Sequence, residues 1–296
     1  MSGDWNLTGG ADPDDGGRRE IADRRASNQP EQGHGRSRGA GGRSGDRGGR
    51  PEDGGRTRSW RRDEPRRAES VLRPELPADV DPNELDQEVR KELLTLPKGL
   101  ADLVGSHLVA AGRVLDEDPQ LALAHARFAR SRASRFAAVR EAAGLAAYHA
   151  GEWSEALSEL RAARRLGGGP GHLALLADCE RALGRPERAL EIAQSPEVSQ
   201  LDTAEAVELR IVAAGARRDL GQFDAAVVAL QGPDLDAAGT QQWRARLRYA
   251  YADNLLAAGR EQEAIRWFVA AAEADVEGVT DAAERAIELS ERAEPR

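Results

Sequence analysis

The chain of 296 residues contains one cysteine, one methionine and two lysines, Lys91 and Lys98. A single thiol, Cys179, excludes an internal disulfide and favours a reducing compartment, where we expect it to be buried and inert. No apolar stretch approaches the roughly 18 residues of a membrane-spanning helix, and the chain starts without the basic-then-apolar pattern of a signal peptide. We therefore predict a cytoplasmic protein that makes no contact with a membrane.

Groups of residues typical of catalytic sites are also lacking. The five histidines show no metal-ligand spacing with one another or with the cysteine. The glycine-rich run at 167–172 lacks the Lys-Ser/Thr pair of a phosphate-binding loop, and there is no Gly-x-Ser-x-Gly elbow. We therefore expect no enzymatic activity, no cofactor and no bound metal.

The sequence divides into a tail and a body of different composition. Residues 1–78 are poor in large aliphatic side chains and rich in Gly, Arg, Asp and Pro, so this segment is predicted to be disordered. From residue 79 onward, 26 basic residues face 37 acidic ones. Apolar residues recur there at helical spacing, which indicates an acidic helical body over 79–296.

The inner part of the tail suggests an alternative function. Residues 33–67 carry eleven arginines against five carboxylates and include an Arg-Gly run at 33–50. Such segments bind RNA or single-stranded DNA through phosphate contacts and arginine stacking. Interleaved acids and scarce aromatic residues favour a solvated linker instead. A second arginine run, at 127–140, is either a basic patch for an acidic ligand or a solvated helix face. Weak nucleic-acid contact through 33–67 therefore remains the alternative.

A six-residue block that begins with Gly and ends with Ala recurs four times in the body. It reads GEWSEA at 151–156, GRPERA at 184–189, GQFDAA at 221–226 and GREQEA at 259–264, with alanine spacings of 33, 37 and 38 residues. Each block separates two runs of helical character, which is typical of stacked helix pairs. The glycines are expected to end one helix in the left-handed conformation, and the alanines to be buried where the next helix crosses it closely. These positions are Gly151, Ala156, Gly184, Ala189, Gly221, Ala226, Gly259 and Ala264.

Two further features set the expected helix boundaries. Asp81 and Pro82 form a helix start, and Leu85 to Leu96 follow at helical spacing until Pro97, so one helix is expected there. Pro196 and Pro233 fall where the second helices of the two middle units would continue, so those helices should be short.

The block and its flanks resemble the tetratricopeptide repeat, a helix–turn–helix unit of about 34 residues. The unit at 151–170 matches with Gly151, Ala156, Leu160 and Ala163, and the resemblance covers roughly 98–295. It implies an all-α solenoid, a right-handed superhelix of antiparallel helix pairs. Helices at 82–115 would cap its start, repeats would occupy about 103–276, and a helix at 281–293 would cap its end.

The resemblance also implies a concave groove, lined by the first helix of each pair, that binds a peptide or helix of another protein. We therefore expect a scaffold or adaptor, with Arg181 and Arg218 contacting acidic side chains of the partner. Tyr148 and Tyr249 would supply aromatic area. The partner and the oligomeric state are left open. Carried onto this chain, the groove positions are Glu141, Tyr148, His149, Asp178, Arg181, Arg218, Asp219, Tyr249 and Asp253.

Overall fold

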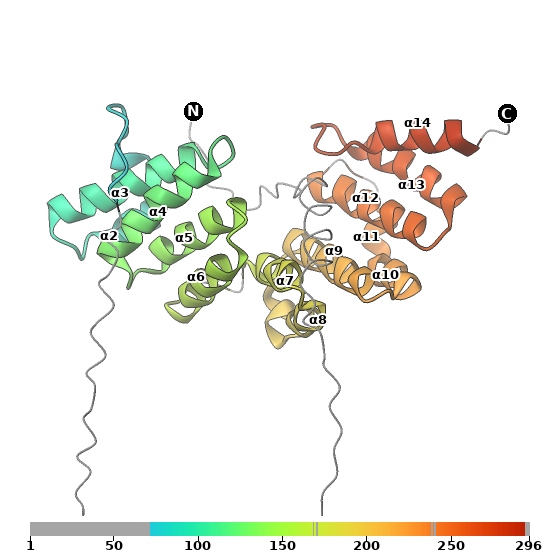
Figure 1. The fold of residues 1–296 in the computed structure, drawn as a ribbon, viewed down its shortest axis with the longest axis horizontal. Helices are drawn as coiled ribbons and strands as arrows, with labels where there is room; N and C mark the ends of the chain where they lie inside the picture. The colour runs from blue at the N-terminus through green and yellow to red at the C-terminus, as the bar shows by residue number, and fades with distance from the viewer. Residues whose placement is uncertain (1–71, 168, 170, 238, 240, 294–296) are drawn as a thin grey trace, which may run out of the picture. The chain divides into compact units, whose positions relative to one another are not determined.

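The computed structural model describes residues 72–293, apart from 168, 170, 238 and 240, so residues 1–71 of the predicted disordered tail lie outside the described residues. Within the described part every regular element is a helix, which confirms the predicted all-α class (Figure 1). None of the helices described is long and apolar enough to cross a membrane. The α-helices are α2 (Gln87–Leu93), α3 (Lys98–Arg113), α4 (Pro119–Ala133), α5 (Ala137–His149), α6 (Trp153–Arg165), α7 (Leu173–Ala182), α8 (Pro186–Ala193), α9 (Thr203–Asp219), α10 (Phe223–Leu230), α11 (Pro233–Asp236), α12 (Gln242–Ala257), α13 (Glu261–Ala274) and α14 (Ala282–Ala293).

Helices that follow one another pack in pairs, and each pair contacts the next (Figure 1). Some first helices also pack on the first helix of the next pair, as α7 does on α9 and α9 on α12. The last helix, α14, packs on α13. The pairs are α3 with α4, α5 with α6, α7 with α8, α9 with α10, and α12 with α13.

The four glycine turns have the same geometry. Gly151, Gly184, Gly221 and Gly259 have φ values of 75°, 75°, 73° and 75°, so the predicted left-handed conformation is confirmed. In each turn the residue after glycine donates its backbone N–H to the carbonyl five positions earlier, at 2.8–2.9 Å. This pattern satisfies carbonyls that would otherwise be left without a donor at the helix end. The same glycine turn therefore reverses the direction of the chain in each of these pairs.

Small residues let the paired helices approach closely. Ala156, Ala189, Ala226 and Ala264 are fully buried, which confirms the burial expected of them. In the α5–α6 pair, Gly144 lies against Leu160 so closely that an added Cβ would be 2.7 Å from the leucine side chain. The core between the helices is built mainly from alanine and leucine.

The second helices of the middle pairs are short, as the prolines predict. Helices α8 and α10 have 8 residues each, against 13 in α6 and 14 in α13. Pro196 and Pro233 instead begin a 3-10 turn (Pro196–Gln200) and the short helix α11. A proline ring blocks the helical hydrogen bond to the preceding turn, which explains the shortening.

The single helix expected after Asp81 is divided into two elements. Asp81 caps a 3-10 turn (Pro82–Glu84) in a capping box with Glu84, and Asp86 then caps α2 by accepting the N–H of Glu88 at 2.6 Å. A second capping residue competes with continued helical bonding, which is the physical reason for the division. Leu85 and Leu93 are nevertheless buried, as their spacing indicates.

Candidate functional site

The residues expected to line the groove all lie on first helices of the pairs. Asp219 is exposed and the others are half-buried. The helix α5 carries Glu141, Tyr148 and His149, α7 carries Asp178 and Arg181, α9 carries Arg218 and Asp219, and α12 carries Tyr249 and Asp253.

Most of these side chains are bonded to one another across neighbouring helices. The hydroxyl of Tyr148 donates to Asp178 Oδ2 at 2.7 Å, and Asp178 Oδ1 accepts from Arg181 Nη1 at 2.9 Å. Arg181 Nε then donates to Asp219 Oδ2 at 3.0 Å, which connects α7 to α9. We call the whole series the polar ladder, and its members are Tyr148, Asp178, Arg181, Asp219, Arg218, Asp253 and Arg285.

The second half of the polar ladder runs from α9 to α14. Arg218 Nη1 donates to Asp253 Oδ2 on α12. The other oxygen of Asp253 accepts from Arg285 Nη2 of α14 at 3.5 Å. The guanidinium of Arg285 also lies 5.2 Å from the ring centre of Phe268, a cation–π distance. Asp253 therefore joins the last pair to both the preceding pair and the terminal helix.

The central members of the ladder are shielded from water. The Arg181 side chain is 11% exposed and that of Asp178 is 15% exposed. Charges this far from water gain more from pairing than surface charges do, and removing one partner leaves the other uncompensated. The arginines expected to contact a partner's acidic groups are thus already paired within the chain, so they act as contacts between helices.

The two tyrosines are packed against their own helix pairs. The ring of Tyr148 makes an edge contact with Trp153, and that of Tyr249 with Phe268, both at 5.3 Å between centres. Burial raises the pKa of Tyr148 well above its usual value, and the charge of Asp178 adds to this effect. The pKa of Tyr249 is likewise raised, first by burial and then by its hydrogen bond to Asp281. Both hydroxyls therefore remain protonated hydrogen-bond donors near neutral pH.

Glu141 and His149 lie outside the polar ladder. Glu141 Oε1 is 2.9 Å from His172 Nε2, and His149 Nδ1 is 3.6 Å from Asp116 Oδ1. Burial lowers the pKa of His149, although Asp116 opposes that shift. Its ring is therefore uncharged near neutral pH.

An apolar pocket of about 260 Å³ opens beside Glu141 and was not foreseen from the sequence. Its carboxylates are Glu141 together with the exposed Asp86 and Glu88. Of its leucines, Leu85 lies in the run for which one continuous helix was expected, and Asp86 caps a separate helix there instead. The apolar lining consists of Leu85, Val89, Leu108, Ala138, Ala142 and Leu145.

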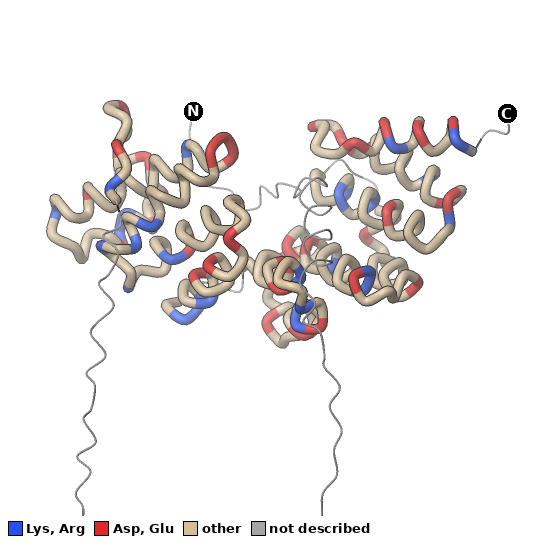
Figure 2. Tube along the Cα trace, viewed as in Figure 1, with Lys and Arg blue, Asp and Glu red and all other residues tan. Residues whose placement is uncertain are grey.

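The arginine run at 127–140 is largely neutralised by carboxylates of α6. Arg127 and Arg130 bond to Glu155, and Arg130 and Arg140 bond to the buried Glu159, each of the latter two at 2.6 Å. Positive and negative residues also alternate elsewhere along the described helices, as on α14 (Figure 2). Three arginines of the run are thus paired within the chain and only partly exposed, which differs from a solvated helix face and argues against a basic binding patch.

The described residues contain no group of three or more His, Cys, Asp or Glu side chains placed to hold a metal ion. Cys179 is fully buried, as expected, and burial raises the pKa of its thiol to about 12. A thiol in that state supplies almost no thiolate at neutral pH.

Comparison with known proteins adds no relative to these observations. No protein-family model matches the chain, and no curated protein matches it.

Proposed function

We propose that the chain is a non-catalytic scaffold or adaptor of the cytoplasm, built as a right-handed superhelix of tetratricopeptide-like helix pairs. A peptide or helix of another protein binds to the surface formed by the first helices α5, α7, α9 and α12. The observation that carries this proposal is the repetition of one glycine turn, with φ between 73° and 75°, in four successive pairs. Such repetition stacks equivalent helices side by side, and repeat proteins use the resulting extended surface for binding.

Two features support this surface as the binding site. The polar ladder fixes the first helices to one another, so little ordering entropy is lost when a partner binds. The apolar pocket beside Glu141 accepts an apolar side chain, while its carboxylates attract a flanking basic residue. Together they favour a partner segment with an apolar anchor and positive charge.

A capture experiment with the full chain tests the proposal. The chain is used as bait in extract of its native cells, beside the Arg181→Ala, Arg218→Ala double variant. A matched control, Arg127→Ala with Arg130→Ala, removes two arginines that are also paired across helices but lie on a second helix. Circular dichroism checks that all three proteins are helical.

We expect one partner to be recovered with the wild type and the control and to be reduced by roughly tenfold or more with the ladder variant. Equal recovery by both variants contradicts a role for the first helices. If only a peptide of residues 1–78 captures a partner, the tail is the functional element. If that partner is RNA or single-stranded DNA, the alternative function replaces the scaffold.

A further inference from the structure

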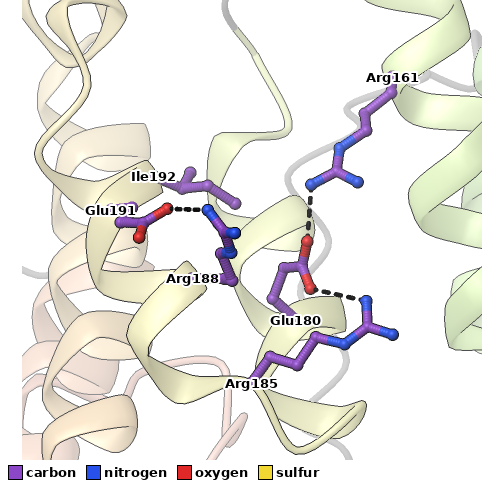
Figure 3. A pocket seen from close by; sticks show the side chains of 6 residues that line it. All are labelled: Arg161, Glu180, Arg185, Arg188, Glu191 and Ile192. Carbon is purple, nitrogen blue, oxygen red and sulfur yellow. Dashed lines mark hydrogen bonds and ion pairs between the residues drawn. The ribbon is translucent and has the colours of Figure 1, made fainter. Parts of the chain in front are cut away.

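A second pocket, of about 450 Å³, lies between α6, α7 and α8, and none of its lining residues belongs to the polar ladder (Figure 3). Its walls combine three guanidinium groups with one buried and one exposed carboxylate. They come from three helices and one turn. The lining residues are Arg161, Glu180, Arg185, Arg188, Glu191 and Ile192.

The buried Glu180 holds two of the arginines in place. Its Oε1 accepts from Arg161 Nη2 at 2.6 Å, and its Oε2 accepts from Arg185 Nη1 at 3.4 Å (Figure 3). Glu180 is 3% exposed, so its charge is costly without these partners. Arg161 and Arg185, whose side chains are 46% and 57% exposed, therefore neutralise the same buried carboxylate at the pocket wall.

The third arginine is held more loosely. Arg188 Nη1 donates to Glu191 at 2.6 Å, but the two side chains are 66% and 62% exposed. An exposed pair of this kind contributes little to the stability of a protein. Arg188 can therefore exchange Glu191 for another anion in the pocket at little cost.

The pocket is positive and has unused donors. The lining carries three positive guanidiniums and the two carboxylates of Glu180 and Glu191, so its net charge is positive. This net charge increases when Glu191 turns to solvent. Each guanidinium has five N–H donors, and each uses one nitrogen for the carboxylate contacts described. A carboxylate offers two oxygens, which one guanidinium can satisfy, whereas a phosphate group offers three. The three guanidiniums that line this pocket carry enough free N–H groups for all three oxygens of a phosphate.

We propose that this pocket binds a phosphate group, carried by a small molecule or by a phosphorylated side chain. Arg161 and Arg185, both paired with the buried Glu180, form one part of the site. Arg188 completes it by leaving Glu191 for the phosphate. This binding is independent of the surface proposed for the protein partner.

Isothermal titration calorimetry of the full chain tests the site, in buffer free of phosphate and sulfate and at constant ionic strength. The probes are inorganic phosphate, a phosphoserine peptide and the same peptide with glutamate in place of phosphoserine. The variants are Arg188→Gln, which removes the partner of the exposed Glu191, and Arg161→Gln, which removes a partner of the buried Glu180. Arg165→Gln, an exposed arginine on α6 outside the pocket, is the control.

We expect saturable phosphate binding that each pocket variant weakens roughly tenfold, because each removes a charge-assisted hydrogen bond. The control is expected to bind as the wild type does. If the phosphoserine peptide binds more tightly than inorganic phosphate, the natural ligand is a phosphorylated side chain. If the two probes bind equally, the natural ligand is a small molecule. Absence of saturable binding to both phosphate probes overturns the proposal, as does binding that Arg188→Gln leaves unchanged. The exposed Arg188 keeps the test valid even if Arg161→Gln unfolds the chain.

Discussion

The guanidinium of Arg181 lies directly over Gly215 of the neighbouring first helix. A Cβ built on Gly215 would be 2.5 Å from Cζ of Arg181, so any larger residue at this position requires the guanidinium to move. One turn further along α9, Asp219 accepts the hydrogen bond from Arg181 Nε. Gly215, which by itself lowers the stability of the helix, thus gives space to a member of the polar ladder.

A double-mutant cycle measures this relationship. Gly215→Ala should fail to give the stabilisation of about 1 kcal/mol that alanine usually brings within a helix, because it displaces Arg181. In an Arg181→Ala background the same change should stabilise the chain. The expected coupling is about 1 kcal/mol in urea unfolding. Gly99→Ala, at a helical position with open space, is the control. Identical effects of Gly215→Ala in both backgrounds would show that the two residues do not interact.

The packing of the glycine turns predicts that Ala156 does not tolerate a larger side chain. Ala156→Leu should lower the free energy of unfolding by about 1–3 kcal/mol, because Ala156 is fully buried and the surrounding helices cannot expand freely. Ser158→Leu adds a leucine at an exposed position of the same helix and should change stability by less than about 0.5 kcal/mol. Equal melting temperatures for Ala156→Leu and the wild type would refute the close crossing.

The buried pair His107 and His125 predicts loss of stability in mild acid. Their Nδ1 atoms are 2.8 Å apart, and the Nε2 of His107 has no hydrogen-bond partner among the described residues. Burial, and then the neighbouring His125 and Arg73, lower the pKa of His107 from 6.5 to about 4. The unfolded chain therefore binds more protons between these values, and stability must fall as the pH decreases from 6.5 towards 4.

Urea unfolding at about pH 7.5 and about pH 5 checks this prediction, with an expected loss on the order of 2 kcal/mol. His107→Leu removes the titrating ring and should make the pH dependence shallower. A wild-type chain and a His107→Leu variant with the same pH dependence would show that this pair does not control acid stability.

Cys179 should be unreactive until the chain unfolds. Its thiol is fully buried and has a pKa of about 12, so both access and thiolate are lacking at neutral pH. Mass spectrometry after treatment with iodoacetamide should find little alkylation of the native chain and complete alkylation in urea. Comparable rates of alkylation in the native chain and in urea would mean that α7 opens readily.

The sequence predicts the regular parts of this fold because they depend on local chemistry. A left-handed glycine, a small residue one turn later and a proline that shortens a helix each act within a few residues, so Gly151, Ala156 and Pro196 could be interpreted without a structure. The spacing of the repeated blocks also predicts the order in which the helix pairs follow one another. These features account for the helix pairs and for the burial of the four alanines.

The contacts of the candidate site could not be predicted in the same way. Whether Arg181 faces a partner protein or Asp219, 38 positions further along the chain, depends on the rotation and distance of two helices. Gly215 was the local signal, since it permits the close approach, but a glycine in a helix has several explanations. The pocket around Glu180 likewise joins residues of α6, α7 and the following turn, which no local pattern connects.

The location of bound partner on the chain tests the proposed function most directly. A photo-crosslinking amino acid is placed singly at Glu141, on the first helix α5 beside the apolar pocket, or at Ser158, exposed on the second helix α6. After irradiation of native cells, we expect a crosslink from position 141 to one protein and none to that protein from position 158. Crosslinks to that protein from position 158 alone, or equally from both positions, would contradict binding on the first-helix surface.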